Sequence, residues 1–267
     1  MNCNKQIPET DLYIVIVFCS ISFCLSIIIP IICLKKNLLE TYTLRIITCM
    51  SINDAICSLA LILYEYFIQV INNCPFLYFF ISGLMSNFIW ALCIALTLRK
   101  VLIQNSDYKI NHFKLWLILA YPITFTLYSI PFLSETFSYN GNMCYFSDKN
   151  YATIWLVFLF ILPFTLFTIF ILFILVNIYF VCRKTDKEPW KSIIIKRGYI
   201  YPLSVLVIVI PAGISFSIEY FLGRCMPDDF SAFLLIFVSS HGIMSALTLM
   251  SNEKVRRQKK FFQIDCY

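Results

Sequence analysis

Apolar stretches of about 20 residues recur along the whole chain, and this length is what a bilayer demands of a spanning helix. The hydrocarbon core is about 30 Å thick and each helical residue rises about 1.5 Å. The stretches do not alternate polar and apolar residues as barrel strands do. Seven of them qualify: Leu12–Leu34, Ile46–Ile71, Cys74–Leu98, Leu115–Leu133, a part of Tyr151–Cys182, Gly198–Leu222 and Phe230–Met250. The sequence therefore predicts an all-α fold, a bundle of seven transmembrane helices.

Composition supports one membrane domain. Of the 267 residues, 60% are hydrophobic and only 13% are charged, whereas soluble domains carry about 25% charge. We expect a short extracellular N-terminus (1–11), a seven-helix domain (12–250) and a short basic cytosolic tail (251–267). A signal peptide is the alternative for the first stretch, but that stretch is longer than a signal h-region and its lysines follow it.

The distribution of Lys and Arg predicts the orientation. The loops after the first, third and fifth segments and the tail hold 3, 4, 6 and 5 basic residues, which is 18 of the 21. Because basic residues concentrate in cytosolic loops, we expect the N-terminus outside and the C-terminus inside. The charge would face anionic lipid headgroups or a protein partner, so no nucleic-acid binding is expected. Lipid anchoring alone is the simpler explanation for many of these residues.

Four of the 12 cysteines fall on the predicted outer side: Cys3, Cys74, Cys144 and Cys225. Cys74 opens the third segment and Cys144 lies in the longest outer loop, 134–150. A Cys74–Cys144 disulfide would hold this loop over the mouth of the bundle and contribute about 2–4 kcal/mol. Pairing of Cys3 with Cys225 is left open.

Polar residues within the apolar segments fall on helical faces, which predicts that they point into the bundle. Asp54 lies nine residues, about 13 Å, beyond Arg45, near mid-bilayer. An isolated carboxylate there costs at least about 2.5 kcal/mol, so it needs a partner or a proton. We predict a proton-sensitive contact with His241 of the seventh segment. The alternatives are a protonated or water-solvated Asp54, and for most other polar residues simple interhelical packing. The predicted faces are Thr48, Ser51, Asp54 and Ser58; Ser82, Ser86, Trp90, Cys93 and Thr97; Ser204, Pro211, Ser215 and Glu219; and His241, Ser245, Thr248 and Asn252.

The outer mouth is predicted to be negative. Outer segments carry six acidic residues against three basic ones, and Glu65 and Glu219 lie just inside. We name Glu65, Asn87, Trp90 and Glu219 as candidates for a ligand pocket. An anion would be repelled there, so the expected extracellular ligand is a neutral or cationic small molecule or peptide.

Several short motifs follow one another along the chain in an order that is typical of one protein family. They are Ser86-Asn87-Phe88-Ile89-Trp90-Ala91-Leu92-Cys93-Ile94-Ala95, Asn111-His112-Phe113 through Tyr121-Pro122, Gly141-Asn142-Met143-Cys144-Tyr145, Tyr201-Pro202, Pro211-Ala212 and Ser240-His241-Gly242. In these the chain resembles the cyclic-AMP-receptor-like family of G-protein-coupled receptors, first known from slime moulds and distantly similar to the secretin/adhesion group. His241 replaces a Gln of the family. The Asp-Arg-Tyr of the rhodopsin group is replaced by Leu98-Arg99-Lys100.

The resemblance implies a plasma-membrane receptor that signals to a heterotrimeric G protein through movement of the sixth helix. Pro211 would kink that helix, and a static kink is the alternative. Candidates for the G-protein contact are Arg99, Lys100, Arg183, Lys184, Lys196 and Arg197. A small-solute transporter or channel is the alternative function. No cofactor, metal or catalytic constellation is expected, so the chain is not predicted to be an enzyme, and cyclic AMP, an anion, is not its expected ligand.

Overall fold

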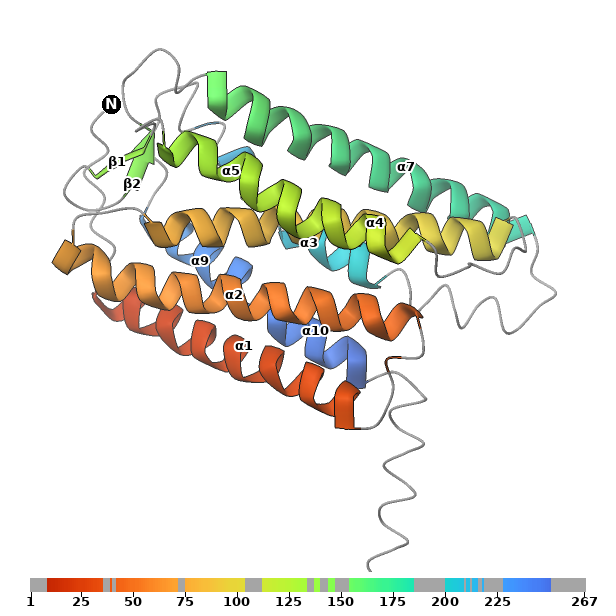
Figure 1. Cartoon of the computed structure of the whole chain (residues 1–267), viewed down its shortest axis with the longest axis horizontal. Coiled ribbons are helices and arrows are strands. Elements are labelled where there is room, and N and C mark those ends of the chain that lie inside the picture. Colours follow the sequence, from red (N-terminus) through yellow and green to blue (C-terminus); the bar gives the residue numbers. More distant parts are fainter. Residues whose placement is uncertain are drawn as a thin grey trace, which may run out of the picture.

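The computed structural model describes residues 9–35, 39, 42–71, 75–103, 112–133, 137–139, 144–146, 154–184, 200–208, 210, 211, 213–215, 218 and 228–250. These residues form an elongated bundle whose helices run lengthwise, with one small hairpin at an end (Figure 1). The helices are α1 (Glu9–Lys35), α2 (Tyr42–Ile71), α3 (Pro75–Ile103), α4 (Phe113–Ile118), η3 (Leu119–Ile123), α5 (Thr124–Leu133), η4 (Leu156–Ile161), α7 (Leu162–Lys184), α9 (Asp228–Ser239) and α10 (His241–Met250). The hairpin pairs β1 (Phe137–Tyr139) antiparallel with β2 (Cys144–Phe146).

Five helices are long and apolar enough to cross a membrane: α1, α2, α3, the run α4–η3–α5 and the run η4–α7. Two shorter apolar helical stretches, Ile200–Ser215 and Phe233–Leu247, lie where the sixth and seventh segments are predicted. The predicted helical bundle is therefore confirmed. The number of crossings and their orientation stay predictions. The hairpin was not predicted, because strands of three residues leave no periodic signal.

The centre of the bundle is formed by α2 and α3. In their apolar windows 67% of the residues are buried, against 28% in α1 and 17% in the run η4–α7. The outer helices therefore present most of their apolar surface outwards, as a lipid-facing helix does. Trp90 of α3 is fully buried and its ring lies 5.8 Å from that of Phe113 and 6.2 Å from that of Tyr121.

The predicted polar faces of the two central helices are confirmed. Polar side chains at these positions avoid lipid, because unpaired polar groups in hydrocarbon are costly. Thr97, nearer the end of α3, is only half-buried. The buried members are Thr48, Ser51, Asp54 and Ser58 in α2, and Ser82, Ser86, Trp90 and Cys93 in α3.

Two spans contain a π-helical segment beside a proline. Pro163 has no N–H, so the carbonyl of Leu159 loses its usual helical partner. The hydroxyl of Tyr128 in α5 donates to that carbonyl instead. In η3, which contains Pro122, the carbonyl of Ala120 accepts a 2.6 Å hydrogen bond from Ser86 Oγ. Side chains of neighbouring helices thus satisfy backbone groups in the irregular turns.

Basic residues and the acidic starts of two helices lie at opposite ends of the bundle. The seven described Lys and Arg residues lie in or next to the terminal turns of helices, at the end of the bundle opposite the hairpin (Figure 1). The acidic starts of α1 and α9 lie at the hairpin end. The basic end of the helices is the end at which the basic loops and tail are predicted. The basic residues are Lys35, Arg45, Arg99, Lys100, Lys114, Arg183 and Lys184.

Candidate functional site: a buried carboxylate shared by three helices

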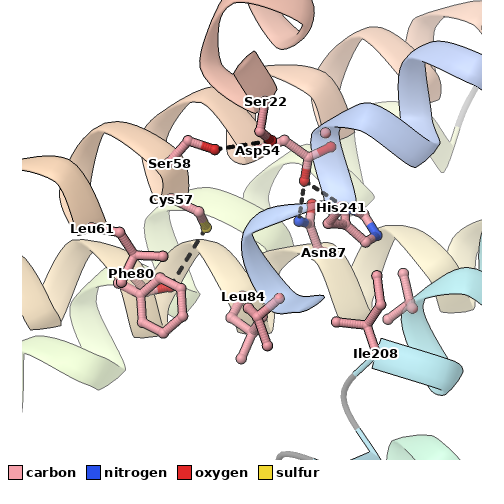
Figure 2. A pocket seen from close by; sticks show the side chains of 13 residues that line it. Ser22, Asp54, Cys57, Ser58, Leu61, Phe80, Leu84, Asn87, Ile208 and His241 are labelled. Carbon is pink, nitrogen blue, oxygen red and sulfur yellow. Dashed lines mark hydrogen bonds and ion pairs between the residues drawn. The ribbon is translucent and has the colours of Figure 1, made fainter. Parts of the chain in front are cut away.

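Asp54 of α2 is buried at the centre of the bundle and accepts hydrogen bonds from two other helices (Figure 2). Asn87 Nδ2 of α3 donates to Asp54 Oδ1 at 2.7 Å. His241 Nδ1 lies 2.6 Å from the same oxygen, and Ser245 Oγ donates to Oδ2 at 2.8 Å. His241 and Ser245 are four residues apart in α10, so they share one helical face. We call these four residues the polar centre. The contact predicted between Asp54 and His241 is present; its proton sensitivity stays a prediction.

A second group of hydrogen bonds extends the polar centre toward α1 and η3. One turn beyond Asp54, Ser58 Oγ donates to Ser22 Oγ of α1 at 3.2 Å. On the adjacent face, Asn53 Nδ2 donates to Ser86 Oγ at 2.8 Å, and Ser86 in turn bonds the η3 backbone. Four helical elements are therefore joined by side-chain hydrogen bonds at one depth, which is the arrangement expected of interhelical polar contacts in lipid.

Gly242 allows α10 to approach α1 closely enough for its neighbour His241 to reach Asp54. A Cβ at position 242 would collide with the hydroxyls of Ser22 and Ser26 and would lie 3.0 Å from the backbone oxygen of Ser22. A larger residue at position 242 would require both serine hydroxyls to turn away and the backbone of α1 to give by a few tenths of an ångström. The close packing of α10 against α1 thus depends on the residue beside the histidine.

The electrostatics of the polar centre depend on His241. The described Lys and Arg residues lie in or next to the terminal turns of helices. Of the groups in contact with Asp54, the imidazole of His241 is the one that can carry a positive charge. Two buried atoms of the centre, His241 Nε2 and Asn87 Oδ1, have no hydrogen-bond partner within the described residues.

A small cavity lies against the polar centre. Ser22, Ser58 and Asn87 give it a polar side, and Val205 and Ile208 of the helical stretch 200–208 give it an apolar side (Figure 2). Its volume is about 20 Å³, which is room for about one water molecule. The cavity is therefore far too small for a nucleotide or peptide.

The two predicted ligand-pocket residues whose side chains are described do not line the same cavity. Asn87 lines the cavity and binds Asp54. Trp90 is packed against Phe113 and Tyr121 rather than lining this cavity. Glu65 lies in α2, but its side chain is outside the description, and Glu219 is outside the described residues. Their binding roles stay predictions.

The predicted switch and docking residues are described in part. Pro211 is helical and half-buried in the stretch that follows Ile200. Arg99 and Lys100 lie near the end of α3, at the basic end of the bundle. Lys184 ends α7, directly after Arg183, whereas Lys196 and Arg197 are outside the described residues.

Cys144 begins β2, whereas Cys74 lies outside the described residues. The bridge between them therefore stays a prediction. Among the described residues, no group of three His, Cys, Asp or Glu side chains is placed to hold a metal ion.

Sequence reasoning missed the contribution of α1. Ser22 and Ser26 are fully buried, four residues apart, in the apolar middle of α1, whereas Ser20 bonds the carbonyl of Ile16 in its own helix. That spacing on one helical face was the available signal. Asn87 was assigned to ligand binding, whereas the structure gives its amide to Asp54.

No protein-family model and no curated protein matches this chain. Functional inference therefore depends on the geometry of the polar centre and on the order of the sequence motifs.

Proposed function

We propose that the chain is a seven-span receptor, of the G-protein-coupled type, that passes an extracellular signal to a cytosolic G protein through movement of its sixth helix. The observation that carries this proposal is the polar centre, in which Asp54 is held by donors from α3 and α10. Making or breaking contacts that three helices share would couple the positions of those helices. The motif order that resembles cyclic-AMP-receptor-like receptors adds support.

The arrangement of helices is compatible with seven crossings. Five long apolar helices and the two shorter stretches Ile200–Ser215 and Phe233–Leu247 together make seven. Seven crossings put the termini on opposite sides. The gathering of the described basic residues at the end opposite the hairpin supports a cytosolic assignment for that end, and thus an N-out, C-in topology in the plasma membrane.

The cavity beside the polar centre lends no support to the alternative, a transporter or channel. A transporter holds its solute near the bilayer midplane between helices. The cavity beside Asp54 has a volume of about 20 Å³, which leaves room for about one water molecule. Pro211, in the stretch beside that cavity, weakens the helix by removing one backbone hydrogen bond. Bending at this point would move the cytosolic half of the helix.

The acidic residues at the hairpin end of the bundle support a ligand that is not an anion. Glu9 and Asp11 lie in the first turn of α1, and Asp228 and Asp229 begin α9, at the same end of the bundle. Their field repels anions and attracts cations. A neutral or cationic small molecule or peptide is the proposed ligand class, and cyclic AMP is not.

The proposal is tested by comparing two activities of the same expressed protein. Cells co-expressing the chain with a panel of G proteins are screened with neutral, cationic and anionic compounds, and nucleotide exchange is measured. Vesicles containing the purified chain are assayed for flux of the same compounds. We expect exchange without flux, and loss of exchange in Asp54→Asn at unchanged surface expression. Flux of a compound without exchange on any G protein would overturn the receptor proposal in favour of a transporter.

A further inference from the structure

We propose that Asp54 and His241 together form a proton-binding site in the middle of the bundle, and that loss of its proton weakens the docking of α10 on α2 and α3. This goes beyond the receptor function and does not depend on it, because no ligand or G protein takes part. Both residues are buried, at 2% and 8% exposure, and their side chains are in direct contact at 2.6 Å.

The hydrogen bonds around Asp54 indicate an ionised carboxylate. Asn87 Nδ2 and Ser245 Oγ are donors, and one reaches each carboxylate oxygen. His241 Nδ1 contacts the oxygen that already accepts from Asn87. A carboxylate accepts from all three neighbours, and a neutral acid could instead donate its own hydrogen to His241 Nδ1. We assign the shared hydrogen to His241 Nδ1, because an imidazole is a stronger base than a carboxylate, and this leaves Nε2 as the position that gains or loses the titrating proton.

The balance of charge depends on that proton. With Nε2 protonated, the imidazolium and the carboxylate form a pair of zero net charge. Without it, the pair carries one negative charge in an interior of low dielectric constant, where an unpaired charge is costly. The Lys and Arg residues described in the structure lie in or next to the terminal turns of helices, whereas Asp54 bonds Asn87, His241 and Ser245.

The other titratable groups that face the pair add no positive charge. They are thiols and phenols, which are neutral when protonated and negative when they are not. Their electrostatic interaction with Asp54 can therefore only disfavour a second negative charge. They are Cys57 of α2, with Cys19 of α1 beside it, Tyr121 of η3 and Tyr201 of the stretch 200–208.

The cavity offers the proton a route. His241 Nε2 is buried without a hydrogen-bond partner in the described part of the chain, and His241 lines the cavity together with Asn87 and Ser58. The cavity has room for about one water molecule. A water there would accept a hydrogen bond from a protonated Nε2 and pass the proton on when the pair releases it.

The helix that carries His241 follows α9 after a single turn residue. Ser240 separates α9 from α10 by a turn, and its backbone still bonds Ile236 and Met244 on either side at 3.0 and 3.1 Å. Two side chains of α10, His241 and Ser245, reach the same carboxylate. Loss of the positive charge weakens the His241 attachment from an ion pair to a neutral Nδ1–H hydrogen bond, so α10 is the element whose docking follows the proton.

The chain suits a direct test, because it has only two histidines. The full chain is purified in lipid nanodiscs with ¹⁵N-labelled histidine, and His112→Gln leaves His241 as the single signal. We expect His241 to be an imidazolium at acidic pH and to lose one proton as the pH rises. In Asp54→Asn it should bind that proton at least tenfold more weakly. A neutral His241 from pH 5 to pH 9, or an unchanged titration in Asp54→Asn, would overturn the proposal.

Hydrogen exchange of the α10 amides tests the link to docking. At each pH the exchange rate of the α10 amides in the parent protein is divided by the rate in His241→Gln. The Gln side chain can donate to Asp54 but does not titrate, so the ratio removes the general pH dependence of exchange. We expect this ratio to rise at least tenfold as His241 is deprotonated. Ser245→Ala is the matched control, because it removes a donor from the same carboxylate but keeps the proton, so its pH response should persist. A ratio that does not change with pH would refute the link.

Discussion

Replacing His241 by Leu removes the imidazole from Asp54 and leaves a buried carboxylate with two of its three donors, Asn87 and Ser245. Loss of one member of a buried ion pair costs about 3–5 kcal/mol in soluble proteins. Interhelical hydrogen bonds in membranes average only about 0.6 kcal/mol. Because two donors remain on a charged acceptor, we expect His241→Leu to lower the free energy of unfolding by about 2 kcal/mol.

A double-mutant cycle isolates the pair from its surroundings. Asp54→Asn and His241→Leu are made singly and together, and unfolding in mixed detergent micelles is followed by circular dichroism. Because each change removes the same interaction, the double variant should lose less than the sum of the single losses, by at least about 1 kcal/mol.

The neighbouring Asn53 supplies the control for this cycle. It is buried in the same turn of α2 but bonds Ser86 rather than the polar centre. Asn53→Ala and His241→Leu should therefore be additive within about 0.5 kcal/mol. If Asp54→Asn were as additive with His241→Leu as Asn53→Ala is, a specific coupling between Asp54 and His241 would be refuted.

Three further changes probe the packing around the polar centre and the outer loop. Gly242→Ala should destabilise the fold by about 1–3 kcal/mol through its collision with α1, and removing the two α1 hydroxyls should restore part of this in the same unfolding assay. Tyr128→Phe leaves the Leu159 carbonyl without its donor and should cost about 1 kcal/mol, whereas no change would mean that this bond does not support the π-helical turn. If Cys144 is bridged to Cys74, reductant should lower stability by about 2–4 kcal/mol, and Cys144→Ser should abolish this sensitivity.

The sequence predicted those features that depend on a single helix, namely its length and its buried face. Apolar length predicts the helical spans, because lipid forces each segment to satisfy its own backbone hydrogen bonds. Periodicity placed Thr48, Ser51, Asp54 and Ser58 on one face of α2, and all four are buried. The cost of an unpaired carboxylate led to His241 as its partner, and that contact is present.

Features that depend on how helices pack against each other were not predictable. Periodicity identifies the inward face of a helix but not the neighbour that it meets. The donor role of Asn87 toward Asp54 required the depth of α3 relative to α2. The close approach at Gly242 depends on how α10 packs against α1. The π-helical turns beside Pro122 and Pro163 depend on hydroxyls from other helices.

The topology of the two termini in intact cells tests the seven-span receptor most directly. Short epitope tags are added at each end of the chain, and antibody staining is compared before and after permeabilisation of the plasma membrane. An odd number of crossings with basic loops inside predicts that the N-terminal tag stains without permeabilisation and the C-terminal tag only after it. Staining of the C-terminal tag on intact cells, or of both tags under the same condition, would contradict the account.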